Sequence, residues 1–127
     1  MNFQIEFTRA PIVAPAREVS KEIGAQVDFW GIVREREQGR AIAGLCYEAH
    51  EPMARAMLAK ILNELSALHD CDEVYFIHRL DFVAVGEASV LVRARARHRQ
   101  AALRLTEELL NRLKADVPIW KQHVAPR

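Results

Sequence analysis

Residues 88–97 alternate without interruption between two kinds of side chain, and this pattern constrains the fold more than any other. One set is small and apolar: Ala88, Val90, Val92, Ala94 and Ala96. The other set is mostly polar: Ser89, Leu91, Arg93, Arg95 and Arg97. Because successive side chains of a strand point to opposite faces, the pattern predicts a strand with one face in a core. We expect Arg93 and Arg95 to form a solvated face.

Several other segments also have the pattern of strands. Residues 2–8 alternate through Phe3, Ile5 and Phe7. Residues 25–34 are rich in Val, Ile, Phe and Trp, which favours a strand there, and further strands are predicted at residues 41–49 and 73–79. We expect residues 41–49 to pair back on residues 25–34 as a long hairpin around a mobile charged loop at 35–40.

Helical signals lie between these strands. Pro15 and Gly24 bound a possible short helix over residues 15–23. A longer helix is predicted from Glu51-Pro52, with one apolar face: Met53, Met57, Leu58, Ile61, Leu62, Leu65 and Leu68. The last helix is expected at 99–114. The fold class is therefore α+β, with a largely antiparallel sheet, about three helices and one domain over residues 1–127.

Composition excludes some classes of function. The net charge is +1 at pH 7, whereas a dedicated nucleic-acid binder is usually far more basic. Cys46 and Cys71 lack CxxC spacing and are typical of free thiols in a reducing compartment. The sequence has no signal-peptide pattern, and no apolar run approaches the roughly 18 residues of a membrane helix. We expect a cytoplasmic protein.

The closing segment from Lys114 to Lys121 places two lysines around a short apolar stretch with Pro118 and Trp120. A lysine whose charge is disfavoured by burial or by other cations can act as an acid, a base or a nucleophile. The alternative is an ordinary apolar strand flanked by solvated lysines. Spacing alone favours the alternative.

A second cluster lies where the strand over 88–97 meets the last helix, at Arg97-His98-Arg99. Free N–H groups at a helix start attract anions, and Arg99 can bind a phosphate through two hydrogen bonds. The alternative is that His98 caps the helix while the arginines are solvated. Arg34 and Arg40 flank the charged loop. No motif indicates a metal site, a phosphate-binding glycine loop or a hydrolase, and no cofactor is expected.

Six short motifs resemble one known family, the large subunit of molybdopterin synthase, in the same order. They are Phe29-Trp30-Gly31-Ile32-Val33-Arg34 with Gly39-Arg40; Leu45-x-Tyr47-Glu48-Ala49-x-Glu51-Pro52-Met53-Ala54; Ile77-His78-Arg79; Val85-Gly86-Glu87-Ala88-Ser89-Val90; His98-Arg99; and Lys114-x-x-x-Pro118-Ile119-Trp120-Lys121. Each motif is weak alone, but together they cover about residues 24–122. Gln122-His123 is a departure, because the family commonly has Glu two residues after the second lysine.

The resemblance implies an α/β-hammerhead-like fold and a sulfurtransferase. Such an enzyme takes sulfur from a thiocarboxylate on the C-terminal Gly-Gly of a ubiquitin-like small subunit. It uses that sulfur to build the dithiolene of molybdopterin on a cyclic pyranopterin monophosphate. The resemblance also implies a homodimer at the centre of a heterotetramer, with one small subunit at each end.

The same resemblance assigns roles to residues. Lys114 and Lys121 would be the catalytic lysines, and Arg34, Arg40, His98 and Arg99 would bind the anionic substrate. Clustered cations would hold the phosphate and the thiocarboxylate and would stabilise a leaving oxygen. Lys114 would be the general acid/base, and Lys121 would orient the tail and the substrate.

Two other functions compete with this one. The chain could be a non-catalytic docking module for a ubiquitin-like sulfur carrier. It could also be a phosphate- or RNA-binding module that uses Arg93, Arg95, Arg97 and Arg99, although the low net charge argues against this. Convergence of the predicted site residues on one pocket, within a chain or across a dimer, would favour the enzyme.

Overall fold

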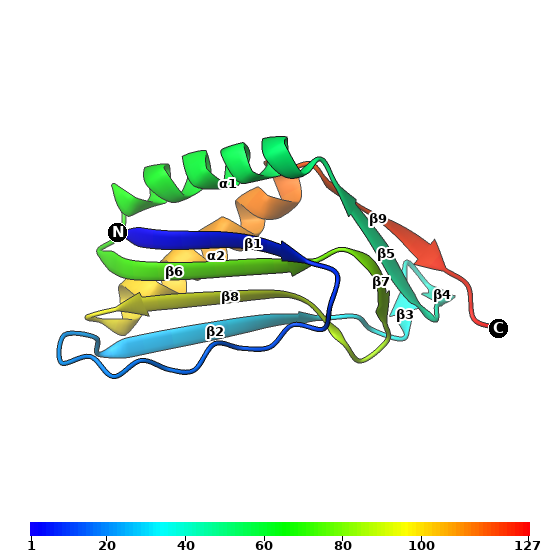
Figure 1. Ribbon diagram of the computed structural model, residues 1–127, viewed down its shortest axis with the longest axis horizontal. Coiled ribbons are helices and arrows are strands. Elements are labelled where there is room, and N and C mark those ends of the chain that lie inside the picture. The colour runs from blue at the N-terminus through cyan, green and yellow to red at the C-terminus, as the bar shows by residue number, and fades with distance from the viewer.

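The computed structural model describes residues 1–127 as two helices and two main sheets, joined by short connections (Figure 1). The larger sheet has the spatial order β1 (Asn2–Thr8), β6 (Cys71–Arg79), β8 (Ala88–Ala96) and β2 (Ala25–Ile32). The smaller sheet has the order β7 (Asp81–Ala84), β5 (Gly44–Ala49) and β9 (Ile119–Val124). A two-stranded ribbon consists of β3 (Arg36–Glu37) and β4 (Arg40–Ala41). The helices are α1 (Glu51–Ser66) and α2 (Arg99–Asp116).

The predicted α+β class is confirmed, and all strand pairs but one are antiparallel. The exception is β1, which runs parallel to β6. Strand β8 is central, because it pairs with β6 on one side and with β2 on the other. The alternation over residues 88–97 therefore marks a strand with neighbours along both edges.

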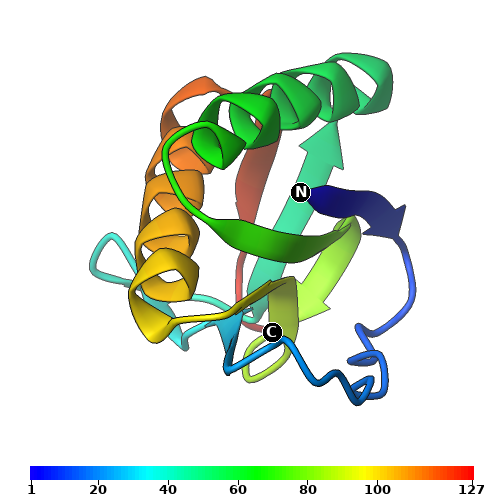
Figure 2. The same ribbon diagram turned by 90° about the vertical axis from the view of Figure 1, so that its left-hand side faces the viewer.

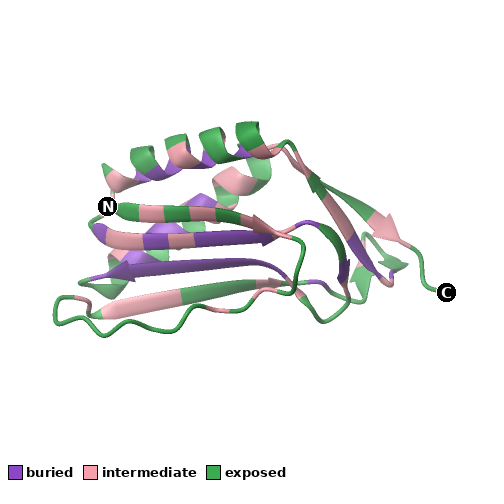
Figure 3. Cartoon of the chain, viewed as in Figure 1, coloured by how far each residue is buried: buried purple, intermediate pink, exposed green.

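Both helices cover one face of the larger sheet (Figures 1 and 2). The apolar side of β8 joins the main core there through Val90, Val92, Ala94 and Ala96. Leu58 and Leu62 of α1 and Leu105 and Leu109 of α2 pack into the same core and are fully buried. Buried positions alternate with exposed ones along α1, as its predicted apolar face requires (Figure 3).

Helix α1 begins at the predicted Glu51-Pro52. His50 is the N-cap residue, and its Nδ1 accepts a hydrogen bond from the Met53 N–H at 3.3 Å. Pro52 lies in the first turn, where a missing N–H costs nothing. Neither helix has the length and apolar composition needed to span a bilayer.

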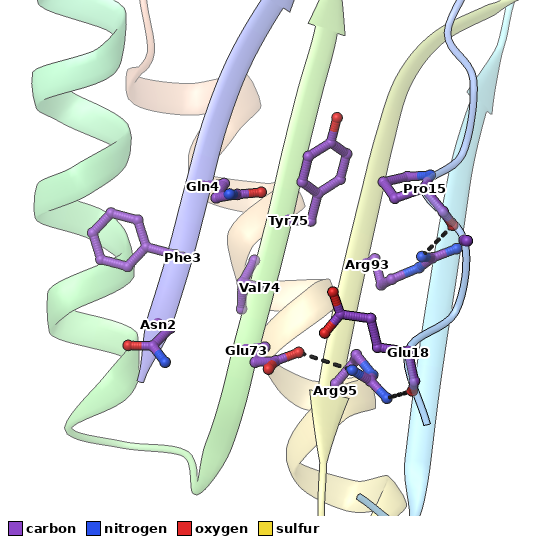
Figure 4. Close-up of a pocket in the computed structure, with 11 residues that line it drawn as sticks. Asn2, Phe3, Gln4, Pro15, Glu18, Glu73, Val74, Tyr75, Arg93 and Arg95 are labelled. Carbon is purple, nitrogen blue, oxygen red and sulfur yellow. Dashed lines mark hydrogen bonds and ion pairs between the residues drawn. The ribbon is translucent and has the colours of Figure 1, made fainter. Parts of the chain in front are cut away.

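The face of β8 away from the helices differs from the expectation, because Arg93 and Arg95 are buried and not solvated. Arg93 donates to both oxygens of Asp28 at 2.8 and 2.9 Å and to the Pro15 carbonyl at 2.7 Å. Arg95 donates to Glu73 at 3.0 Å and to the Glu18 carbonyl. Figure 4 shows Arg93 directed toward Pro15, and Arg95 directed toward Glu73 and Glu18.

These contacts attach residues 9–24, which we call the strap, to the outer face of the sheet. The strap connects β1 to β2 and holds no helix, so the predicted helix over residues 15–23 is wrong. The carbonyls of Pro15 and Glu18 accept hydrogen bonds from arginine side chains, and no helical ladder forms there. The protein therefore has two helices where about three were expected.

The predicted hairpin between residues 25–34 and 41–49 is also wrong. Strand β5 pairs with β7 and β9 in the smaller sheet, while β2 pairs with β8. The charged loop instead folds back on itself as the β3–β4 ribbon. Its two turn residues, Gln38 and Gly39, have φ values of 51° and 76°, as in the tight turns that join twisted strands.

The two sheets meet where β6 runs into β7. Leu80 is buried between them, and Asp81 takes a left-handed φ of 66° as the chain passes to the smaller sheet. The ring of His78 packs edge-on against Tyr47 of β5, with centroids 4.9 Å apart. Burial lowers the pKa of His78 to about 4, opposed in part by a hydrogen bond to the Arg79 carbonyl. His78 is therefore a neutral packing residue at the junction.

Removing the Arg93 side chain should destabilise the protein. Arg93→Ala leaves Asp28 without its partner and frees the Pro15 carbonyl, so we expect the free energy of unfolding to fall by about 2–3 kcal/mol. Arg97→Ala is the matched control, because Arg97 lies on the same face of the alternating segment but is exposed. Urea denaturation measures the free energy of unfolding of both variants. Equal losses in the two would contradict the stabilising role assigned to the contacts of Arg93.

His78 should make stability depend on pH. Its pKa is about 4 when folded and about 6.5 when unfolded, so its contribution is complete above pH 6.5 and is lost as the pH falls toward 4. His78→Phe removes this titration. Between pH 6.5 and pH 4, the free energy of unfolding of this variant should therefore fall by about 3 kcal/mol less than that of the wild type. Urea denaturation at several pH values tests this, with His98→Asn as an exposed control. Parallel curves for the wild type and His78→Phe would refute it.

Candidate functional site

Two of the predicted site residues meet at a carboxylate that the sequence did not single out. The Lys121 ammonium of β9 donates to Glu37 Oε1 at 2.7 Å. Arg34, just after β2, lies 3.5 Å from the other oxygen, Oε2. The hydrogen bond from Lys121 has the largest effect and lowers the pKa of Glu37. Burial opposes it, and the charges of Lys121 and Arg34 lower the pKa further. Glu37 is therefore ionised at neutral pH and joins two cations from separate elements.

Arg40 belongs to the same ribbon. It pairs with Glu37 across the β3–β4 register, and the turn at Gln38-Gly39 separates them. Arg40 is exposed and makes no ion pair. Arg40 was expected to lie near Arg34, and the path of the ribbon, which begins soon after Arg34, agrees with this.

Lys114 lies in the last turn of α2 and is exposed. Val117 and Pro118 then lead into β9, and the Pro118 carbonyl accepts a hydrogen bond from the His50 N–H. This bond fixes the end of α2 beside the start of α1 and beside the smaller sheet. Lys114 and Lys121 are seven residues apart, which limits their backbones to roughly 25 Å of separation.

His98 and Arg99 lie at the other end of α2. His98 is the N-cap residue, but its side chain makes no capping hydrogen bond. Arg97 and Arg99 are exposed, as the alternative of solvated arginines expected. The first turn of α2 contains no acidic residue. Gly24, Arg97, His98, Arg99 and Gln100 line an open hollow of about 430 Å³ here, with no apolar side chain among them. The hollow has the character of an anion site.

One chain does not bring these two groups together. His98 follows the end of β8 where Ala96 pairs with Ala25, whereas Arg34 follows Ile32 at the opposite end of the same strand pair. The seven residue steps from Ala25 to Ile32 separate those ends by about 24 Å. In Figure 1 the start of α2 and the smaller sheet lie at opposite ends of the molecule.

The outer face of the larger sheet offers a different hollow, of about 260 Å³, under the strap (Figure 4). None of the predicted site residues lines it. Arg93 and Arg95 do, but both are engaged in ion pairs. The four arginines from 93 to 99 therefore do not form one cationic face, which removes the basis of the RNA-binding alternative.

Other ionisable residues have structural roles. Glu87 accepts hydrogen bonds from Arg79 at 3.2 Å and from the Ala84 N–H at 3.3 Å, and so holds the turn between β7 and β8. No group of three His, Cys, Asp or Glu side chains is placed to hold a metal ion.

Glu37 is the one residue of this cluster that sequence reasoning missed. Its position in a charged loop predicted only solvation, and its contact with Lys121 spans 84 residues. A carboxylate between an arginine and a glycine turn carries no local signal of such a partner.

The family model for the MoaE protein matches residues 6–116. The chain belongs to the MoaE family. The match covers nearly all of the elements described above, and it confirms the resemblance found in the sequence motifs.

Named relatives agree with this assignment. The chain is 44% identical over 101 residues to the molybdopterin synthase catalytic subunit of Oryza sativa subsp. indica, covering 80% of this chain and 52% of that protein. It therefore spans about half the length of the rice protein. The crystal structure of molybdopterin synthase from Staphylococcus aureus has a TM-score of 0.82 and 30% identity, covering 94% of this chain and 90% of that one. A complex of subunits 1 and 2 of molybdopterin-converting factor from Helicobacter pylori 26695 has a TM-score of 0.68 and 26% identity, covering 84% and 74%.

Proposed function

We propose that this MoaE-family chain is the catalytic subunit of molybdopterin synthase, with residues 1–127 acting as one unit. It would transfer sulfur from the C-terminal thiocarboxylate of a ubiquitin-like small subunit to cyclic pyranopterin monophosphate and so make the dithiolene of molybdopterin. The observation that carries the proposal is the meeting of Arg34 and Lys121 at one point, from β2 and β9, in a chain of this family.

The charges suit the reaction. The substrate carries a cyclic phosphate, and the donor carries a negative thiocarboxylate. Arg34, Arg40 and Lys121 offer exposed cationic groups at one end of the molecule. Such groups hold both anions and stabilise the oxygen that leaves as the phosphate ring opens and water is lost. We assign proton transfer to Lys114 and orientation of tail and substrate to Lys121.

The separation of His98 and Arg99 from the lysines supports a site completed by a second copy. If β2 paired antiparallel with β2 of another copy, the Ala25 end of one strand would lie beside the Ile32 end of the other. His98 and Arg99 of one copy would then approach Arg34 of its partner. Two equivalent sites would form about one twofold axis.

The outer edge of β2 is suited to this contact. It is an edge strand of the larger sheet, so its outer backbone N–H and C=O groups have no strand partner. Phe29 and Trp30 are each 37% exposed, and Ile32 is 51% exposed. Apolar side chains beside an unpaired edge favour burial against another chain.

The small subunit would bind at each end of this homodimer, giving a heterotetramer. The likeness to the Helicobacter pylori complex of subunits 1 and 2 supports such a partner. Cys46 and Cys71 are free thiols, and this supports a reducing, cytoplasmic location.

The assay that tests the function uses purified protein, thiocarboxylated small subunit and cyclic pyranopterin monophosphate, with molybdopterin as the readout. Lys114→Ala should lower the rate by about 100-fold or more, because it removes the proposed general acid/base. Lys60→Ala, in the middle of α1, is the control and should leave the rate unchanged. A wild type that binds the small subunit but makes no molybdopterin would favour the docking module instead.

Mixing two strongly impaired variants tests the composite site. A Lys121→Ala copy and an Arg99→Ala copy, refolded together, form mixed dimers in which one of the two sites has every residue intact. We expect about one quarter of the wild-type rate from random pairing. If each site came from one chain, mixing would restore nothing.

A further inference from the structure

The β3–β4 ribbon carries Glu37 to the cationic end of the molecule. Its register places Arg36 opposite Ala41 and Glu37 opposite Arg40. Gly39 at φ 76° closes the turn, in a conformation that other residues adopt only with strain. The base of the ribbon is fixed, because Val33 and Ile42 are buried in a small core with Leu45 and Val83.

Glu37 is more shielded from solvent than the cations that it contacts. Its side chain is 14% exposed, compared with 46% for Lys121 and 78% for Arg34. A charge-assisted bond of 2.7 Å to a shielded carboxylate restricts the long and flexible lysine side chain. The Lys121 ammonium thus takes its position from the ribbon as well as from β9.

No other carboxylate serves these cations. Of the six predicted site residues, only Arg34 and Lys121 form ion pairs, and both pair with Glu37. His123 points to the same side of β9 as Lys121, two residues along, and lies opposite Leu45. The side chain of His123 forms no hydrogen bond with Lys121. The only anchor for the Lys121 ammonium therefore comes from a distant part of the chain.

We propose that Glu37 is a positioning residue of the active site. It holds Lys121 and Arg34 in one arrangement, so that an anionic group of the substrate or of the thiocarboxylate tail meets both cations together. Glu37 acts through these two residues and does not itself touch the reacting atoms. This inference rests on the proposed function of the chain.

The test compares Glu37→Ala and Glu37→Gln with Glu35→Ala in the molybdopterin assay. Glu35 is the matched control, because it is an exposed glutamate just before the same ribbon, and its side chain makes no hydrogen bond or ion pair. We expect kcat to fall about tenfold in Glu37→Ala, with a smaller change in KM, because misplaced groups slow the reaction. Glu37→Gln keeps an oxygen that can accept a hydrogen bond from Lys121, so its kcat should lie between those of Glu37→Ala and the wild type. Glu35→Ala should match the wild type.

A double-mutant cycle separates positioning from general damage to the fold. If Glu37 acts through Lys121, then Glu37→Ala should have little additional effect on kcat in a Lys121→Ala background. A full additional tenfold loss there, or equal kcat for Glu37→Ala and Glu35→Ala, would overturn the proposal. An inactive wild type would instead overturn the function on which it rests, so the two failures are distinguishable.

Discussion

Strand β8 is buried on both faces although one face carries two arginines, and the arrangement of the molecule follows from this. The apolar face requires the two helices, which cover it with leucines and alanines. The arginine face requires acceptors, since buried guanidinium groups are stable only when their donors are paired. Asp28, Glu73 and the carbonyls of the strap supply them, and of the two arginines only Arg95 has a nitrogen, Nε, that is buried without an acceptor. The strap is therefore held to the sheet by charge and hydrogen bonding.

Strand β8 also separates the predicted site residues into two groups, one at each of its ends. Its C-terminal end leads to His98 and Arg99 at the start of α2, and its N-terminal end lies beside the junction with the smaller sheet. The junction is rigid for local reasons: Leu80 is buried, and His78 packs against Tyr47. Tyr47 in turn lies opposite Lys121 in the β5–β9 register, so the backbone of Lys121 is positioned by the packed junction.

Local pattern was enough to predict part of this fold. The strands at 2–8 and 88–97 and the helix from Glu51 were predictable, because period and capping chemistry are properties of neighbouring residues. The strap was not predictable, since its conformation depends on arginines about 77 residues away. The pairing of β5 was not predictable either, because adjacent segments need not share a sheet. Within the site, Lys121 and Arg34 could be named from motifs, but the carboxylate that joins them could not.

The unpaired edge of β2 has a consequence for the chain during its synthesis. Asp28 is the only charged side chain on this strand, and Arg93 engages it, so little on the edge repels a foreign strand. The strand also contains no proline. Natural sheets usually protect such edges against uncontrolled strand addition and aggregation. In the proposed dimer this protection comes from assembly itself, so copies made faster than they find a partner would be the ones at risk of aggregating.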